Sequence, residues 1–141
     1  MLRISLLFTL LVSANLVYAN CKVPSTLENL TIISSTDPTY SSVNPNAGDV
    51  YRVLYAKDKY TAKLLNKNQP DYKGEYSYSV LDDVNGVGLF TGHEGLPLKK
   101  PTHTILFKCV TDDSGTAIFT QTPGINEPKS RQNTVRYFIL R

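Results

Sequence analysis

The chain has 141 residues and a formal net charge of +3, from 15 Lys and Arg against 12 Asp and Glu. A length of this order corresponds to one domain. The charge is too small to recruit nucleic acid or an anionic membrane. Two cysteines are too few for a disulfide-dense miniprotein or a four-thiolate zinc site. With 41% hydrophobic residues, the chain can build one core.

The start of the chain has the pattern of a secretory signal peptide. A basic residue, Arg3, precedes an apolar stretch that ends at Val12, and Val17-Tyr18-Ala19 stands before the expected cleavage site. A membrane anchor is the alternative, but the apolar stretch is shorter than the roughly 18–20 residues that span a bilayer. We therefore expect residues 1–19 to be a signal peptide and residues 20–141 to be a single secreted, extracellular domain.

Export determines what we expect of the two cysteines. In an oxidising compartment Cys21 and Cys109 form a disulfide by default, with free or intermolecular thiols as the alternative. The bond would fix a chain terminus that otherwise frays. Asn29-Leu30-Thr31 fits the N-glycosylation pattern, so we expect a glycan on Asn29.

Residues 34–49 are rich in Ser, Asn, Pro and Gly, which predicts a long surface loop. After this loop the residue pattern is typical of β-strands, predicted over Val50–Ala56, Tyr60–Leu65, Glu75–Leu81, Val87–Thr91, His103–Val110 and Thr116–Thr122. Asn126–Gln132 is predicted as a polar loop. The pattern leaves Leu27–Ile33 ambiguous and leaves Val135–Leu140 open between a strand and a short helix. About six strands joined by short turns predict an all-β fold, an antiparallel barrel or sandwich with one disulfide.

The residues that support catalysis in other proteins do not form a recognisable arrangement here. His93 and His103 lack the close spacing of a helical zinc motif, so each is predicted to lie on the surface. Asp82-Asp83 and Asp112-Asp113 occupy positions where turns favour Asp. The sequence has no nucleophile elbow and no phosphate-binding loop. We therefore expect no enzymatic activity, no metal and no cofactor.

Tyr and Phe residues are frequent in the predicted strands. They either fill a solid core, with their hydroxyls turned to solvent, or line a cavity with apolar walls and a few hydroxyl donors. The sequence leaves these two interpretations equally open.

The segment Thr104–Pro123 resembles a late hairpin of secreted invertebrate lipocalins, which include the salivary types of blood feeders and relatives of apolipoprotein D. In that family an apolar strand with a Cys, here Cys109, is followed by an acidic-glycine turn and a returning strand. The family's Cys commonly pairs with one near the mature amino terminus, which matches Cys21. Gly48–Val53 stands where the family has its first-strand Gly-x-Trp motif, with Val50 at the Trp position.

This lipocalin-like resemblance implies a cup-shaped barrel that carries a small hydrophobic or amphipathic molecule and needs no cofactor. The residues we expect to line its cavity and bind the ligand are Tyr51, Val53, Tyr76, Tyr78, Phe107 and Phe119. The alternative is a secreted β-rich interaction protein without an internal ligand. It would act on a protein partner through surface loops at residues 34–49 or 92–101. Neither interpretation involves nucleic acid or a membrane.

Overall fold

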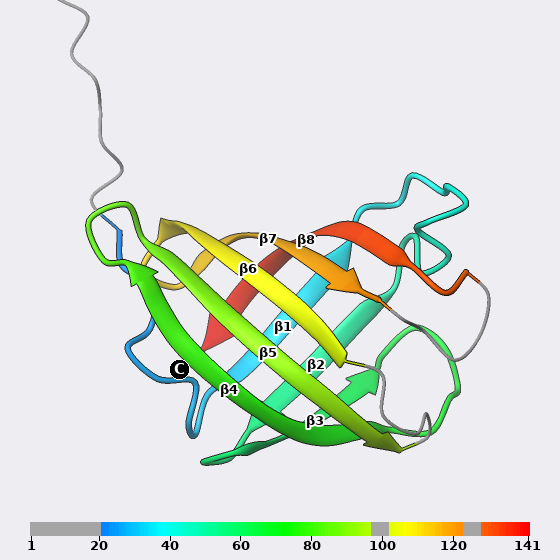
Figure 1. Cartoon of the computed structure of the whole chain (residues 1–141), viewed down its shortest axis with the longest axis horizontal. Helices are drawn as coiled ribbons and strands as arrows, with labels where there is room; N and C mark the ends of the chain where they lie inside the picture. The colour runs from blue at the N-terminus through cyan, green and yellow to red at the C-terminus, as the bar shows by residue number, and fades with distance from the viewer. Residues whose placement is uncertain (1–20, 97–101, 123–127) are drawn as a thin grey trace, which may run out of the picture.

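The computed structural model describes residues 21–96, 102–122 and 128–141. These residues form eight strands that close into one barrel, in which each strand pairs antiparallel with the next and the last pairs with the first (Figure 1). The strands are β1 (Thr31–Thr36), β2 (Val50–Tyr55), β3 (Lys59–Leu64), β4 (Tyr72–Asp82), β5 (Val87–Leu96), β6 (Thr102–Thr111), β7 (Ser114–Gln121) and β8 (Arg131–Leu140). The all-β prediction is confirmed, and the architecture is the barrel.

The predicted signal peptide, residues 1–19, lies outside the described residues. Residues 97–101 and 123–127 lie outside them as well, so part of the predicted loop at 92–101 and part of that at 126–132 are not covered. No helix in the described part of the chain is long and apolar enough to cross a membrane.

Strand β4 illustrates how the sequence specifies a barrel. Its side chains alternate along the whole strand, with Tyr76 and Tyr78 facing the interior and Ser77 and Ser79 facing outward. A period of two is required when one face of a strand lines an interior and the other meets solvent. The alternation predicted for Glu75–Leu81 is confirmed, and the strand extends beyond it at both ends.

The prediction of about six strands was too low, because the described residues contain eight. One additional strand is β1, whose last three residues lie in the segment 34–49 that was predicted to be a loop. Ser34 pairs with Tyr51 of β2 on one side and with Tyr137 of β8 on the other. The other is β8, and Arg131 and Gln132, predicted as loop, begin it. Backbone pairing on both sides outweighs the low strand propensity of these polar residues.

The segment Gly48–Val53 begins the second strand, whereas the resemblance placed it at the first. Gly48 has a φ of 76°, a left-handed conformation that glycine adopts without strain, and it ends the connection between β1 and β2. The first strand is formed instead by Thr31–Thr36, of which the sequence pattern left residues 31–33 ambiguous and predicted residues 34–36 as loop.

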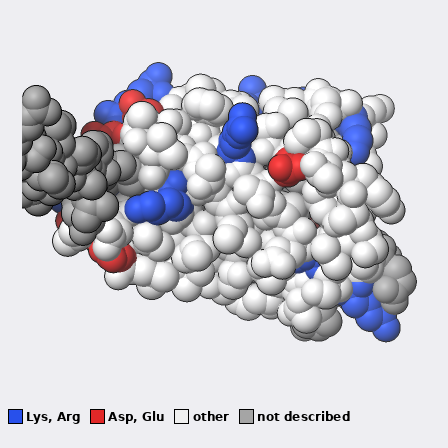
Figure 2. Space-filling model, turned by 90° about the horizontal axis from the view of Figure 1, so that it is seen from above, with Lys and Arg blue, Asp and Glu red and all other residues white. Residues whose placement is uncertain are grey.

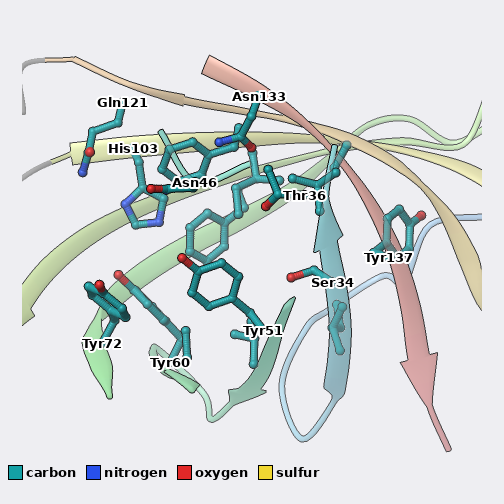
Figure 3. Close-up of a pocket in the computed structure, with 18 of the residues that line it drawn as sticks. Ser34, Thr36, Asn46, Tyr51, Tyr60, Tyr72, His103, Gln121, Asn133 and Tyr137 are labelled. Carbon is teal, nitrogen blue, oxygen red and sulfur yellow. The ribbon is translucent and has the colours of Figure 1, made fainter. Parts of the chain in front are cut away.

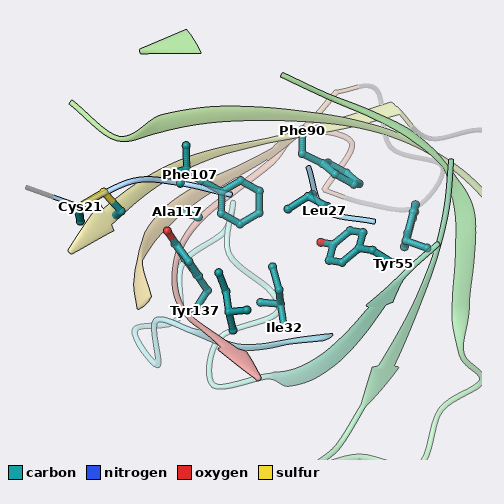
Figure 4. Packing of buried hydrophobic residues seen from close by; sticks show 12 residues of the cluster. Cys21, Leu27, Ile32, Tyr55, Phe90, Phe107, Ala117 and Tyr137 are labelled. Carbon is teal, nitrogen blue, oxygen red and sulfur yellow. A yellow bond between two sulfur atoms is a disulfide. The ribbon is translucent and has the colours of Figure 1, made fainter. Parts of the chain in front are cut away.

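Residues 21–30 cross one end of the barrel and close it, and we call this the plugged end. Leu27 is buried among the interior side chains (Figure 4). The hydroxyl of Tyr78 donates a hydrogen bond to the carbonyl of Pro24 at 2.9 Å. The disulfide between Cys21 and Cys109 ties the crossing segment to β6 over a sequence separation of 88 residues. The predicted pairing of the cysteines is confirmed.

The turns at the plugged end contain the two aspartate pairs, in the turn positions that the sequence predicts. Asp82 accepts a hydrogen bond from the backbone N–H of Asn85 at 2.9 Å. Asp112 accepts one from the backbone N–H of Lys22 at 2.9 Å, which joins the β6–β7 turn to the crossing segment. These carboxylates therefore stabilise turns and the closure of the barrel.

The opposite end, which we call the loop end, is the one at which β1, β3, β5 and β7 end and β2, β4, β6 and β8 begin (Figure 1). The β1–β2 connection, residues 37–49, folds around the buried side chain of Asn44, whose amide donates a hydrogen bond to the carbonyl of Asp37 at 3.3 Å. The buried carboxylate of Asp49 forms an ion pair with Lys67 of the β3–β4 connection. The connection is therefore fixed to a neighbouring loop.

Candidate ligand-binding cavity

The barrel contains a cavity of about 170 Å³. Its apolar walls come from strands all around the barrel and include Ile32, Val53, Ile105, Phe107, Ala117 and Val135. Its polar lining includes Tyr60, Tyr72, Glu94, His103, Gln121 and Arg131. His103, Gln121, Tyr60 and Tyr72 gather on one side of the pocket, whereas Tyr137 lies on the other (Figure 3). The cavity is therefore amphipathic.

A glycine brings two of the polar side chains together. Tyr60 of β3 pairs with Gly74 of β4, and Gly74 pairs with Glu94 of β5, so these inward positions form one row with no side chain at its centre. A Cβ at position 74 would lie 2.8 Å from the ring of Tyr60. The ring of Tyr60 therefore fills the interior space that a side chain at position 74 would occupy, and it extends toward Glu94.

A second glycine positions His103, which pairs directly with Gly92. A Cβ at position 92 would lie 2.7 Å from Cε1 and Nε2 of His103 and 2.6 Å from Phe90. The imidazole lies between two phenyl rings, with ring centroids 5.4 Å from Phe90 and 5.2 Å from Phe119. His103 therefore forms part of an aromatic wall.

Three of the residues that line the cavity each contain a buried polar atom that has no hydrogen-bond partner among the described residues. These atoms are the hydroxyl of Tyr60, Oε1 of Glu94 and Nδ1 of His103, and the exposed fractions of these residues are 6%, 8% and 6%. A buried polar atom without a partner costs about 1–3 kcal/mol. Native proteins keep few such groups, and each calls for a specific explanation.

Burial also shifts the protonation equilibria of this cluster. It raises the pKa of the Glu94 carboxyl to about 7, against the opposing effect of the Arg131 guanidinium. Burial, together with a smaller effect of the nearby His93, lowers the pKa of His103 to about 4. Burial raises the pKa of the Tyr60 hydroxyl, as does the charge of Glu94. At neutral pH His103 is uncharged, Tyr60 keeps its proton and Glu94 is protonated in a large fraction of molecules.

The other tyrosines at this end of the cavity have partners of their own. The hydroxyl of Tyr51 donates a hydrogen bond to Asp49 at 3.2 Å. The hydroxyl of Tyr72 donates one to the side-chain oxygen of Gln69 at 2.9 Å. Tyr60 therefore differs from its neighbours in presenting a hydroxyl that nothing in the described protein engages.

The structure separates the residues predicted to bind the ligand into two groups. Four of them line the cavity, namely Tyr51, Val53, Phe107 and Phe119. The two others, Tyr76 and Tyr78, do not belong to its lining. The hydroxyl of Tyr76 donates to the carbonyl of Ala56 at 2.7 Å, and that of Tyr78 is bound to Pro24. Both rings pack against the core.

The polar cluster was not predicted from the sequence, and the prediction that His103 lies on the surface was wrong. The signal was present in the alternation of β6. A period of two that places Ile105, Phe107 and Cys109 inside also places His103 inside. His93 occupies an outward position of β5 and is exposed, as predicted. Its Nδ1 lies 3.2 Å from the hydroxyl oxygen of Thr102.

Comparisons with protein-family models, with curated proteins and with solved structures found no match. The described residues contain no group of three or more His, Cys, Asp or Glu side chains placed to hold a metal ion. The functional inference therefore starts from the cavity and its chemistry.

Proposed function

We propose that the protein is a secreted, lipocalin-like carrier that holds one small amphipathic molecule inside the barrel and catalyses no reaction. The observation that carries this proposal is that Tyr60, Glu94 and His103, three residues that line the cavity, each contain a buried polar atom without a partner among the described residues. A ligand with an apolar body and a polar head would pack on the apolar wall and satisfy these atoms.

The size of the cavity supports a ligand of one or two rings. An apolar protein cavity of about 150 Å³ is known to bind benzene, and this one measures about 170 Å³. Eight strands give a barrel interior wide enough for side chains and one small ligand. The same fold hosts many functions, so the proposal depends on the lining rather than on the barrel.

The disulfide supports the part of the proposal that concerns export, because such bonds persist in oxidising compartments. Asn29, the proposed glycosylation site, is exposed in a turn before β1. The mass of protein secreted from a eukaryotic host, before and after enzymatic deglycosylation, tests both points. A secreted chain that begins at Asn20 and loses a glycan mass is the expected result.

The carrier proposal is tested by native mass spectrometry of the secreted protein, compared with its denatured mass. We expect an additional small-molecule mass that is lost on denaturation, or uptake of added toluene by ligand-free protein. Protein that is ligand-free and takes up neither toluene nor phenol would contradict the proposal.

A pair of variants on β3 provides the control. Ala62 lines the cavity, whereas its neighbour Thr61 faces the outside of the barrel. Ala62→Phe fills part of the cavity and should abolish toluene uptake, whereas Thr61→Phe should leave it unchanged. Equal uptake by both variants would place the binding outside the barrel.

The exterior favours a second candidate, a protein-interaction module. The face seen in Figure 2 has few charged side chains. On the outside of β6 and β7, Leu106 and Ile118 pair directly and are 39% and 43% exposed. Replacing both by Ser would abolish partner binding on this account and would leave toluene uptake unchanged on the carrier account.

A further inference from the structure

We propose that Tyr60, Glu94 and His103 form a subsite for an uncharged hydroxyl group, and that the ligand is a compact aromatic alcohol or phenol. This inference rests on the proposed carrier function and specifies the chemistry of its ligand. Three observations support it: the convergence of the three groups, their hydrogen-bonding capacity, and the aromatic wall beside them.

The three groups converge on one region of the cavity. Tyr60 and Glu94 flank Gly74 in one row of inward positions. The next inward position on β5 after Glu94 is Gly92, and His103 of β6 pairs with it. The ring centroids of Tyr60 and His103 lie 5.8 Å apart, with the rings nearly perpendicular. The three side chains therefore occupy neighbouring inward positions of the cavity wall.

The hydrogen-bonding capacity of the three groups matches that of a hydroxyl. A hydroxyl offers one donor and two acceptor positions. The Tyr60 hydroxyl and a protonated Glu94 carboxyl would donate to it, and Nδ1 of a neutral His103, with its proton on Nε2, would accept from it. All three polar atoms that lack partners would then be satisfied at once.

Charged head groups fit this subsite less well. A ligand carboxylate would meet the Glu94 carboxyl and the acceptor nitrogen of His103. A ligand ammonium would enter a cavity that the Arg131 guanidinium already lines. Burying a charge without full compensation is costly.

The body of the ligand is expected to be aromatic because the wall beside the subsite is aromatic. Phe90, His103 and Phe119, which all line the cavity, form a continuous series of contacting rings across β5, β6 and β7, with centroid distances of 5.2–5.4 Å. A flat ring can stack on or meet the edge of such rings. The cavity volume admits one or two rings.

The proposal is tested by calorimetric titration of the secreted protein at pH 7 with toluene, phenol, benzylamine and benzoate, which are similar in size. We expect phenol to bind at least tenfold more tightly than toluene, and benzylamine and benzoate to bind more weakly than phenol. Toluene binding as tight as phenol binding would overturn the hydroxyl subsite and leave the carrier function intact. Tighter binding of benzylamine or benzoate would assign a charged head. No binding of any of the four probes would contradict the carrier function itself.

A matched pair of variants separates recognition from packing. Tyr60→Phe removes the hydroxyl without a partner, whereas Tyr76→Phe removes a hydroxyl that is bound to Ala56 outside the cavity lining. We expect Tyr60→Phe to abolish the preference for phenol over toluene while the ligand-free protein keeps or raises its melting temperature. Tyr76→Phe should lower the melting temperature and keep the preference. An unchanged phenol preference in Tyr60→Phe would overturn the proposal.

Discussion

The plugged end and the cavity of this barrel treat their buried polar groups in opposite ways. At the plugged end, the hydroxyl of Tyr78 is bound to Pro24, and the backbone of Tyr55 exchanges hydrogen bonds with Asn29 and Leu30. In the cavity, buried polar atoms of Tyr60, Glu94 and His103 have no partner in the described protein. The first arrangement stabilises the fold, whereas the second lowers stability and, in the proposed carrier function, offers hydrogen-bonding groups to a ligand.

This difference shows how a small barrel can combine stability with binding. Satisfied hydrogen bonds, buried Leu27 and the disulfide concentrate stabilising interactions at one end. The cavity can then keep costly polar atoms, because proteins tolerate strained or unsatisfied groups at functional sites when other regions compensate. Substitutions in the two regions should therefore differ in their effects on stability and on ligand binding.

Removal of the disulfide should have the largest effect on stability. Replacing both Cys21 and Cys109 by Ser releases a long loop, which in the chain-entropy model costs roughly 4–5 kcal/mol of unfolding free energy. Urea unfolding measures this loss. The toluene affinity of the protein that remains folded should not change, and a loss of binding with an intact fold would show that the two ends are coupled.

Truncation of the plug should have the next largest effect. Leu27 is 1% exposed, so Leu27→Ala should lower the unfolding free energy by about 3 kcal/mol through lost burial and a new cavity. Leu65→Ala is the control, because Leu65 is 47% exposed and lies outside the core cluster. Its effect should stay within about 0.5 kcal/mol. Similar losses in both variants would contradict the role of Leu27 as a plug.

The polar cluster should make stability depend on pH in two opposing ways. His103 has a folded pKa of about 4, below its usual value of 6.5, so its contribution to stability is lost as pH falls through this interval, by roughly 3 kcal/mol. Glu94 has a folded pKa of about 7, above its usual 4.5, so its contribution falls as pH rises through that interval.

Two variants separate these contributions in urea unfolding at pH 4 to 8. In Glu94→Gln, stability should rise between about pH 4 and 6.5 and then stay level, because the His103 effect remains. In His103→Phe, stability should fall between about pH 4.5 and 7, because the Glu94 effect remains. The same pH profile in both variants would mean that these groups do not titrate as buried residues.

Adding a side chain at a glycine in the cavity wall should have a moderate effect on stability and on phenol binding. In Gly92→Ala the new Cβ would collide with Phe90 and His103, so we expect a loss of about 1–3 kcal/mol and weaker phenol binding. In Gly95→Ala the nearest atom would lie 3.7 Å away, an ordinary contact, so both quantities should hardly change. Thermal unfolding and calorimetric titration measure the two effects. Unaltered phenol binding in Gly92→Ala would argue against His103 as part of the site.

The smallest expected effect on stability is that of removing the hydroxyl of Tyr78, which we expect to be structural and not to contact the ligand. Tyr78→Phe removes the hydrogen bond to Pro24 and should cost about 1 kcal/mol of stability without altering phenol binding. Thermal unfolding and calorimetry report the two quantities. Weakened phenol binding in this variant would place Tyr78 in the ligand-binding site, as predicted from the sequence.

The sequence predicts most of the barrel because its strands follow simple alternation. Glu75–Leu81 alternates with a period of two, Val50–Tyr55 is rich in β-branched and aromatic residues, and both lie in strands. Ser34 and Arg131 were misassigned because their strand conformation comes from pairing with neighbouring strands rather than from local propensity.

The candidate site was predicted only in part, because a cavity wall depends on how strands are arranged around the barrel. Phe107 and Phe119 were identified from their strand position and apolar character. Glu94 and His103 were missed because a charged or titratable residue in a strand is usually solvated. The alternation of β6 places His103 inside, whereas the inward position of Glu94 follows only from its pairing with Gly74.

The most direct test of the central claim, that the cavity and not the rest of the barrel binds a small molecule, is methyl NMR during titration with toluene. We predict that the methyl signals of cavity residues Ile32, Val53, Ile105 and Val135 shift together. The signals of Val23 at the plugged end and of Leu106 and Ile118 on the exterior should stay unchanged. Shifts confined to the exterior methyls, or none at saturating toluene, would contradict the account.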